Sequence, residues 1–381
     1  MDPVSHTLVG AALAQTGLER RSAYGAAALI IGANLPDLDA ITMFISADTS
    51  LYWRRGWTHG LPAVVVLPLL LTALLCLWDR WVGRRSGPTS LRPKTLLGLS
   101  YLAVATHPAL DWLNNYGMRW LMPFDGRWYY GDAVFIVDPW FWLILGGALF
   151  LGRSHRIWSL LGWALFAGLA IWLLQIGVPE LPLARALWGG VVVVLVLLRL
   201  GGVGRHQASA SRIAIFALAL LALYVGAMVA SARYASGAVE RALLARGLRV
   251  EQLMVGPMPV TPLVRDVVVA TADGYRHGAA RLWPRFELEL EPRALPRLLE
   301  SAPVETALRS PAVRGFASWA RFPFAEIEER ASTYAVYLMD ARYVRRRRVG
   351  FGSARVELPK AQLPPAPTGP ARPARSGAGA N

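Results

Sequence analysis

The sequence is poor in cysteine and lysine, and its first residues lack the features of a signal peptide. Its single cysteine, Cys76, excludes an intramolecular disulfide. Lys94 and Lys360 are the two lysines, so the net charge of +15 comes almost wholly from arginine. The opening MDPVSHTLVG lacks the basic region and the cleavage site of a signal peptide, and we expect it to be retained. The arginines form no patch interleaved with aromatic residues, so we expect no nucleic-acid partner.

Long apolar runs are what the sequence has in abundance. Hydrophobic residues make up 54% of the 381 residues, and the mean hydropathy of +0.36 indicates a polytopic membrane protein. Runs at or near the ~20 residues needed to cross a bilayer predict spans. They lie at about 22–36, 61–79, 96–113, 134–152, 157–177, 183–200 and 212–232. The shorter segment 3–17 predicts a helix that lies at the membrane interface or dips into it.

Arginine-rich segments alternate with the other connections between these spans. The positive-inside rule assigns four of them to the cytoplasm: 18–21, 80–95, 152–156 and 199–212. The remaining connections then fall consistently on the outer side: 35–60, 114–133 and 178–182. The charge pattern therefore predicts which end of the helical bundle faces outward.

After the last span the composition changes. Residues 235–358 are mixed, with strand-like RDVVVAT, RFELELE and TYAVYLMD, an Asp-Gly turn in VVVATADGYRHG and a short helix in SPAVRGFASWARF. Pro, Ala, Gly and Arg dominate the tail 359–381, which we expect to be disordered. The predicted fold is mainly α: a polytopic helical membrane bundle over 1–234, followed by a small α+β soluble domain over 235–358 on the outer side.

Polar residues in the apolar half recur in short motifs. In chain order these are VSHTL with His6, NLPDLD with Asp37 and Asp39, GWTHG with His59, and ATHPALDW with His107 and Asp111. His107 and Asp111 are four residues apart, so one face of a helix carries both. Under the predicted topology all of these residues lie at the outer end of the bundle.

Histidine and carboxylate at this density suit a divalent metal, with zinc as the first expectation and manganese or iron behind it. Asp37 is the expected ligand of its pair, and Asp39 is expected to orient or deprotonate a water molecule. Arg54 and Arg55 suit an anionic substrate group, because guanidinium matches phosphate geometry, and equally suit interfacial anchors. We take Asp39 and Arg55 as the candidate catalytic residues.

Each motif also has a plain structural interpretation. Taken alone, His107 and Asp111 are more typical of a hydrogen-bonded pair, NLPDLD of a turn, and His59 of an interfacial histidine beside tryptophan. Together at one membrane face they favour a shared site. The other histidines are expected to be ordinary surface residues: His155, His206 and His277.

The motifs MDPVSHTLVGAAL, NLPDLD, RRGWTHG and THPALDWLNNYG resemble those of the YdjM-like family of inner-membrane, LexA-regulated, metal-dependent hydrolases. The resemblance covers roughly residues 1–150. It implies a helical membrane part, a multi-pass location in the bacterial inner (cytoplasmic) membrane, and metal-dependent hydrolysis. It transfers a reaction class and no substrate.

A more distant likeness is to the helical zinc-dependent phospholipase C enzymes, whose ligands follow the order His, Asp, His, then His-x-x-x-Asp. Here the order is His6, Asp37, His59, His107 and Asp111. By that likeness the last four hold one metal, while His6 and Asp111 reach a second. The sequence lacks the free amino-terminal ligand of those enzymes and the downstream His and Glu of a three-metal cluster. The expectation is therefore one or two ions.

The sequence thus predicts a membrane-bound metal-dependent hydrolase that acts on a phosphoester or lipid-like substrate through a metal-activated water at the outer face. Its expected partners are the lipid bilayer and a small-molecule or lipid substrate, and the oligomeric state is left open. Two alternatives are a divalent-cation transporter and a membrane anchor for a binding domain with a structural metal. A transporter is expected to carry ionisable residues near the midplane of several spans, and the spans after residue 140 have almost none.

Overall fold

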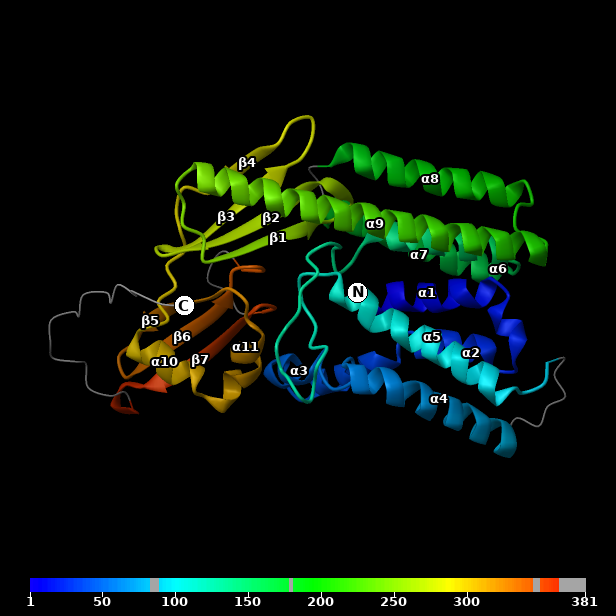
Figure 1. Cartoon of the computed structure of the whole chain (residues 1–381), viewed down its shortest axis with the longest axis horizontal. Coiled ribbons are helices and arrows are strands. Elements are labelled where there is room, and N and C mark those ends of the chain that lie inside the picture. The colour runs from blue at the N-terminus through cyan, green and yellow to red at the C-terminus, as the bar shows by residue number, and fades with distance from the viewer. Residues whose placement is uncertain (83–88, 178–180, 345–349, 363–381) are drawn as a thin grey trace, which may run out of the picture. The chain divides into compact units, whose positions relative to one another are not determined.

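The computed structural model describes residues 1–82, 89–177, 181–344 and 350–362, with elements labelled as in Figure 1. It divides into two compact units, one from Met1 to Ala294 and one from Leu295 onward. The helices of the first unit are α1 (Pro3–Gln15), η1 (Leu18–Arg21), α2 (Gly25–Gly32), η2 (Leu35–Phe44), α3 (Ala47–Trp53), α4 (Leu61–Trp81), α5 (Pro93–Trp112), α6 (Pro139–Arg153), α7 (Ile157–Gly177), α8 (Pro182–Leu200) and α9 (Gln207–Ala245).

Among the described residues, four helices are long and apolar enough to cross a membrane: α4, α7, α8 and α9. The α2 helix and η2 form a fifth candidate, bent by 49° where Asn34 and Pro36 interrupt the α-helix. The α6 helix is shorter, and α5 has the length but not the apolarity. Of the runs predicted as spans, 61–79, 157–177, 183–200 and 212–232 fall in these four helices and 22–36 overlaps the bent pair, whereas 96–113 and 134–152 lie mostly in helices that lack the apolarity or the length of a span.

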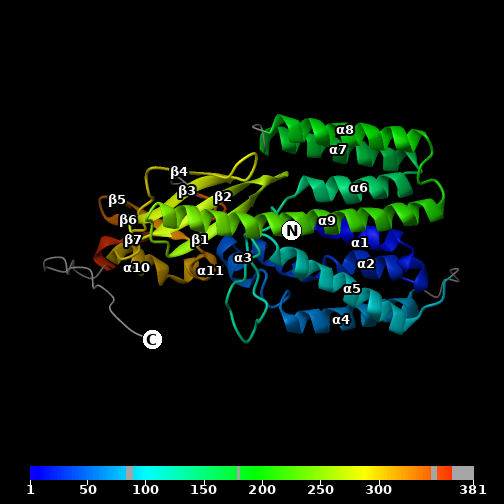
Figure 2. The ribbon, with the colours of Figure 1, turned by 45° about the horizontal axis from the view of Figure 1, so that its top comes forward.

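The segment 3–17, expected at the membrane interface, instead forms α1, which packs against α2, α6 and α9 inside the bundle (Figure 2). Asp2 caps this helix by accepting a hydrogen bond from the Ser5 backbone N–H at 3.0 Å. Gly10 permits the close approach of α2, because a Cβ there would lie 2.5 Å from the Leu29 carbonyl oxygen. Small residues thus let α1 be buried on several sides, and α1 carries His6 into the interior.

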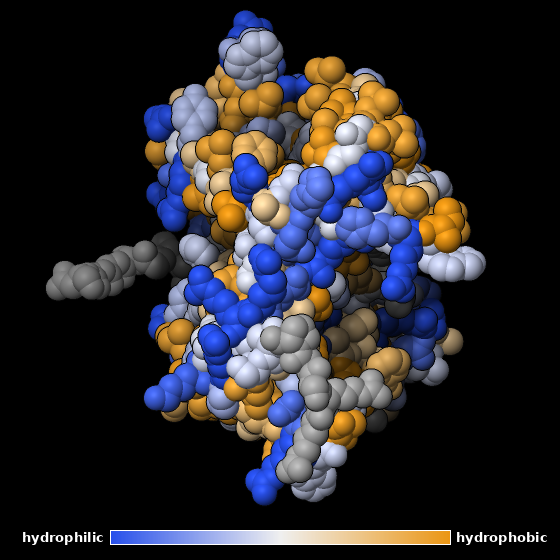
Figure 3. Space-filling view, turned by 90° about the vertical axis from the view of Figure 1, so that its right-hand side faces the viewer, coloured by the Kyte–Doolittle hydropathy of each residue, from blue (hydrophilic) through white to orange (hydrophobic). Residues whose placement is uncertain are grey.

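The basic segments meet at one end of the bundle. Arg153 pairs with Glu19 at 2.7 Å, and the Arg199 guanidinium donates to the Ser154 carbonyl at 2.6 Å. Figure 3 looks onto this end and shows hydrophilic side chains across its middle with hydrophobic surface on both sides. This grouping agrees with the charge segregation expected from the sequence. Residues 83–88 of the predicted segment 80–95 lie outside the described residues.

An antiparallel sheet completes the first unit. Its strands follow in sequence order: β1 (Gln252–Met258), β2 (Thr261–Thr271), β3 (Gly274–Arg281) and β4 (Glu287–Leu290). The predicted Asp-Gly turn joins β2 to β3, where Thr271 pairs with Gly274. Val267 and Val269, two positions apart on one face of β2, pack with Val239 of α9 in a buried cluster. The C-terminal part of α9 therefore packs against one face of the sheet, and the two together form a hydrophobic core.

The α9 helix joins the bundle to this sheet without a break. Its 39 residues run through the boundary expected at 234/235. Arg265 of β2 is fully buried and donates to the carbonyls of Ala133 at 2.9 Å and Met228 at 2.7 Å, which fixes the sheet to the bundle. The domain limits 1–234, 235–358 and 359–381 remain a prediction, and from residue 363 the expected disordered tail lies outside the described residues.

The second unit is a smaller α+β body. Its elements are α10 (Ala302–Leu308), η3 (Pro311–Val313), α11 (Arg314–Trp319), β5 (Pro323–Glu329), β6 (Thr333–Asp340), β7 (Ser353–Pro359) and η4 (Lys360–Gln362). The strands form an antiparallel sheet in the order β5-β6-β7. Phe316 and Trp319 of α11 are fully buried, and buried Arg342 pairs with buried Asp340 at 2.9 Å. The predicted fold class is confirmed: mainly helical, with membrane-spanning helices followed by small antiparallel sheets.

Candidate metal centre

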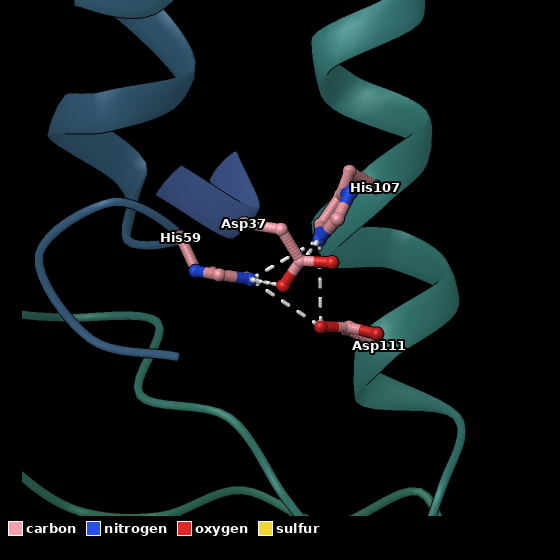
Figure 4. A group of neighbouring side chains, drawn as sticks. All are labelled: Asp37, His59, His107 and Asp111. Carbon is pink, nitrogen blue, oxygen red and sulfur yellow. Dashed lines mark hydrogen bonds and ion pairs between the residues drawn. The ribbon is translucent and has the colours of Figure 1, made fainter. Parts of the chain in front are cut away.

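Four polar side chains from three segments converge at the far end of α5 from the basic segments. They are Asp37 of η2, His59 of the loop that precedes α4, and His107 and Asp111 of α5 (Figure 4). One potential ligand atom of each lies within 4.8 Å of the others, so the group can hold a metal ion. The structure thus brings together four of the five residues that the sequence analysis expected as metal ligands.

Both histidines present the Nε2 atom to the centre. The His107 Nδ1 lies 2.6 Å from the Ala33 carbonyl oxygen, which can only accept, so in a neutral ring the proton sits on Nδ1. The His59 Nδ1 lies 3.2 Å from Oδ2 of Asp39, which sets the same tautomer. The two Nε2 atoms are 3.2 Å apart. In the neutral rings two lone pairs then face each other, an arrangement that a cation between them stabilises.

The two carboxylates complete this donor set. Oδ2 of Asp111 lies 3.3 Å from Nε2 of His59 and 3.6 Å from Nε2 of His107, and Oδ1 of Asp37 lies 3.9 and 3.8 Å from the same atoms. The other carboxylate oxygen of Asp37, Oδ2, is buried without a hydrogen-bond partner among the described residues. Two imidazoles and two carboxylates suit zinc, manganese or iron, so the residues fit a divalent metal.

The surroundings of His59 favour positive charge at this point. Burial disfavours the charged imidazole, but hydrogen bonds to Asp111 and Asp39 outweigh it and raise the pKa of His59. The same carboxylates that favour a proton on the ring favour a metal cation beside it.

Arg55, expected as a catalytic residue, lies buried behind Asp111. Its Nε is 2.9 Å from Oδ2 of Asp111, and its Nη1 donates to Asn114 at 2.8 Å and to the Gly117 carbonyl at 3.3 Å. The backbone of Arg55 adopts the left-handed conformation, with φ of 52°, which is uncommon for a residue other than glycine. Its N–H donates to Oδ2 of Asp39 at 2.9 Å. Arg55 therefore fixes the position of two carboxylates at once.

His6 lies against the four-residue group without being part of it. Its ring stacks on the His107 ring with the centroids 3.7 Å apart, and its Nε2 lies 3.3 Å from Oδ1 of Asp111. The Nδ1 of His6 is buried without a hydrogen-bond partner among the described residues. The amino group of Met1 also contacts Oδ1 of Asp111.

Asp39 and Arg54 occupy different positions around the centre. Oδ2 of Asp39 accepts from Thr58 Oγ1 at 2.8 Å and faces His59, on the side of the imidazole away from Nε2. The Arg54 guanidinium donates to Oδ1 of Asp37 at 3.1 Å. Its Nε has no hydrogen-bond partner among the described residues, and the nearest carboxylate oxygen, Oδ1 of Asp39, is 3.8 Å away.

Supporting residues that the sequence analysis missed are Thr58, Asn114 and the Ala33 carbonyl. Thr58 Oγ1 lies 2.9 Å from Nδ1 of His59 and 2.8 Å from Asp39. Thr58 directly precedes His59, and Asn114 follows Asp111 by three residues, so proximity in sequence is the signal that was available. The contact of the Ala33 carbonyl with His107 could not be predicted from residue type, because every residue has a backbone carbonyl.

The remaining histidines lie away from this centre. His155 and His206 are exposed, as expected. The expectation for His277 is wrong, because it lies on β3 and is only 2% exposed. The β2–β3 pairing places His277 opposite Val268, which is also fully buried.

The fold and the centre define a helical membrane protein with a candidate four-residue metal site at one end of its bundle. Residues 1–179 match the family model described as YdjM inner membrane protein, which confirms the predicted resemblance over that region. The centre lies entirely within the matched residues. The family description names a location and no chemical activity.

One relative and the solved structures complete the comparison. The protein described as "Uncharacterized protein YfhP" of Bacillus subtilis (strain 168) is 28% identical over 112 residues, which is 29% of this chain. The match covers 32% of that protein, so it spans about a third of the relative's length. No solved structure matches the chain, and the likeness to phospholipase C stays a prediction.

Proposed function

We propose that this protein is a membrane-bound metal-dependent hydrolase that acts on a phosphoester or lipid-like substrate. The observation that carries the proposal is the pair of Nε2 atoms of His59 and His107, 3.2 Å apart, with Asp37 and Asp111 beside them. A divalent ion held by this set, zinc in the first place, supplies Lewis-acid activation of water. This reaction class needs no further cofactor.

The protein side chains have distinct parts in this proposal. Arg54 faces the substrate, because its side chain is 23% exposed beside the centre and its guanidinium suits an anionic phosphoester. Asp39 positions His59 by accepting from its Nδ1, and Arg55 positions Asp111 through two nitrogens. His6, together with Asp111, would be a ligand of a second ion.

We propose that the centre and the β1–β4 sheet lie on the outer side of the inner membrane. The support is the position of the arginine-rich segments at the opposite end of the bundle, where Arg153 pairs with Glu19 of the segment 18–21 and Arg199 donates to Ser154, because the positive-inside rule predicts cytoplasm there. Cysteine substitutions at exposed Arg127 and exposed Arg156, in a Cys76→Ser background, test this with a membrane-impermeant thiol reagent on intact cells. Labelling at Arg127→Cys alone is expected, and labelling at Arg156→Cys alone would reverse the orientation.

The experiment that tests the metal centre is elemental analysis of detergent-purified protein prepared without chelators. We expect about one or two equivalents of zinc, manganese or iron in the wild type, and loss in His107→Ala and Asp111→Ala. His155→Ala is the matched control, because His155 is an exposed histidine distant from the centre. Metal that survives both ligand substitutions, or none in the wild type, would overturn the proposal.

Hydrolysis is then measured on phosphoesters with the metal-loaded wild type and the same variants. The variants should lose hydrolysis in proportion to the metal they lose. Stoichiometric metal without turnover of any phosphoester would support the alternative in which the metal is structural.

A further inference from the structure

The candidate centre is open to its surroundings at two side chains. Arg54 and Asp37 are 23% and 12% exposed, whereas His59, His107 and Asp111 are at most 1% exposed. Asp37 lies in η2 and Arg54 directly follows α3, which packs against η2. A substrate therefore reaches the centre past η2 and α3.

These two elements and the residues that directly follow each of them expose many large apolar side chains. The most exposed are Phe44, at 92%, Ile45, at 73%, and Ile41, at 70%. We call the whole set the 38–57 patch; it consists of Leu38, Ile41, Met43, Phe44, Ile45, Trp53 and Trp57. Monomeric soluble proteins rarely expose so many large apolar side chains together, so the patch marks a binding surface.

The 38–57 patch continues onto a helix that can cross the membrane. The α4 helix begins four residues after Trp57, packs against η2, and exposes Leu61, Val65 and Leu69 toward its N-terminal end. The η2 helix is itself the second half of the bent candidate span formed with α2. The patch therefore adjoins a helix that is long and apolar enough to cross a membrane, and this favours the bilayer as its occupant over a soluble partner.

The two tryptophans of the patch and the neighbouring Arg54 also suit a lipid leaflet. Trp53 and Trp57 flank Arg54, and tryptophan is enriched at the depth of the lipid headgroups. The Arg54 Nη1 lies 3.7 Å from the Met43 sulfur, so the guanidinium lies against apolar surface. The Arg54 side chain is 23% exposed, so its guanidinium can donate to a phosphate at headgroup depth.

We propose that the 38–57 patch is embedded in the lipid leaflet and that the centre takes its substrate directly from the bilayer. The substrate is then a lipid-linked phosphoester, with its phosphate at Arg54 and its apolar chain over Phe44 and Ile41. The substrate part of this inference rests on the proposed hydrolase function. The embedding of the patch does not.

The embedding is tested first, without reference to activity. Full-length Phe44→Cys in a Cys76→Ser background is labelled with a nitroxide in lipid nanodiscs, with Arg127→Cys, at an exposed loop residue, as the control. The label at residue 44 should be relaxed by oxygen and shielded from a water-soluble nickel chelate, and the label at residue 127 should show the reverse. Nickel access at residue 44 would overturn the proposal. So would shielding from both reagents with dipolar broadening, which indicates a second copy of this chain on the patch.

The substrate class is tested with Ile41→Ser/Phe44→Ser, a variant that leaves the metal ligands in place. We expect at least a tenfold fall in hydrolysis of long-chain phospholipid vesicles and less than a twofold change on bis(p-nitrophenyl) phosphate, because the apolar contact is lost and the centre is not. Equal effects on both substrates would refute access from the bilayer. If the wild type hydrolyses neither, the proposed function fails, while the nitroxide result still decides the position of the patch.

Discussion

Replacing Asp39 by asparagine changes one charge beside the centre and almost no volume. Oδ2 of Asp39 accepts hydrogen bonds from the Arg55 backbone N–H at 2.9 Å and from Thr58 Oγ1 at 2.8 Å, and it faces Nδ1 of His59 at 3.2 Å. An asparagine with its amide nitrogen at this position cannot accept from Nδ1. His59 would then take the other tautomer, which places the proton on the Nε2 that faces the centre.

The asparagine can also turn its oxygen toward His59, and this orientation sets the lower bound on the effect. Its NH₂ group would then occupy the place of Oδ1, on the side of the Arg54 Nε at 3.8 Å, so two donors would face each other. The full negative charge behind His59 would be lost in either orientation. Such partners of ligating histidines are worth about 10–100-fold in metal affinity, or about 1.4–2.7 kcal/mol.

The assay is competition for zinc between the detergent-purified protein and a chromophoric chelator, with wild type and Asp39→Asn measured side by side. Asp125→Asn is the matched control, because Asp125 pairs with exposed Arg127 outside the centre. We expect the Asp39→Asn protein to remain folded and to bind zinc at least tenfold more weakly. Unchanged affinity in a folded variant would refute the argument that Asp39 sets the tautomer of His59.

Two further predictions concern buried ion pairs, and a third concerns the transporter alternative. Arg55→Met should lower the free energy of unfolding by about 3–5 kcal/mol, read from thermal unfolding, because the buried carboxylate of Asp111 loses the guanidinium that pairs with it. Arg127→Met, which breaks an exposed pair, should change the free energy of unfolding little. In the second unit, Asp340→Ala should cost a similar amount and increase proteolysis there, because Arg342 is fully buried beside it; an unchanged digestion pattern would contradict this. Proteoliposomes of the wild type should carry no zinc flux above protein-free liposomes, and a flux lost on substitution of the ligands would support the transporter alternative.

The convergence of the centre was predictable because it depends on patterns local in sequence. The spacing of His107 and Asp111 places both on one face of α5. The alternation of arginine-rich segments then places NLPDLD and GWTHG at the same end as ATHPALDW. Residue type and charge bias were sufficient for this part.

The parts that the sequence did not predict depend on contacts between distant segments. Whether Arg55 faces the substrate or Asp111 is decided by how the loop before α4 packs on α5, and the left-handed backbone of Arg55 has no sequence signal. The burial of α1 depends on close approaches such as that of Gly10 to α2, and neither this nor the burial of His277 on β3 follows from residue type. Hydropathy alone does not distinguish an apolar segment covered by protein from one covered by lipid.

The continuity of α9 has a consequence for the sheet that it carries. At 1.5 Å per residue its 39 residues extend about 58 Å, well beyond the ~30 Å hydrocarbon core of a bilayer. The distance between the β1–β4 sheet and the bundle is therefore set by the length of a continuous helix. The hydrogen bonds of Arg265 fix the rotation of the sheet about the helix axis. One residue inserted in α9 between Met228 and Ala235 would turn the sheet by about 100° and separate Arg265 from its carbonyl acceptors. A flexible linker would absorb the same insertion without effect.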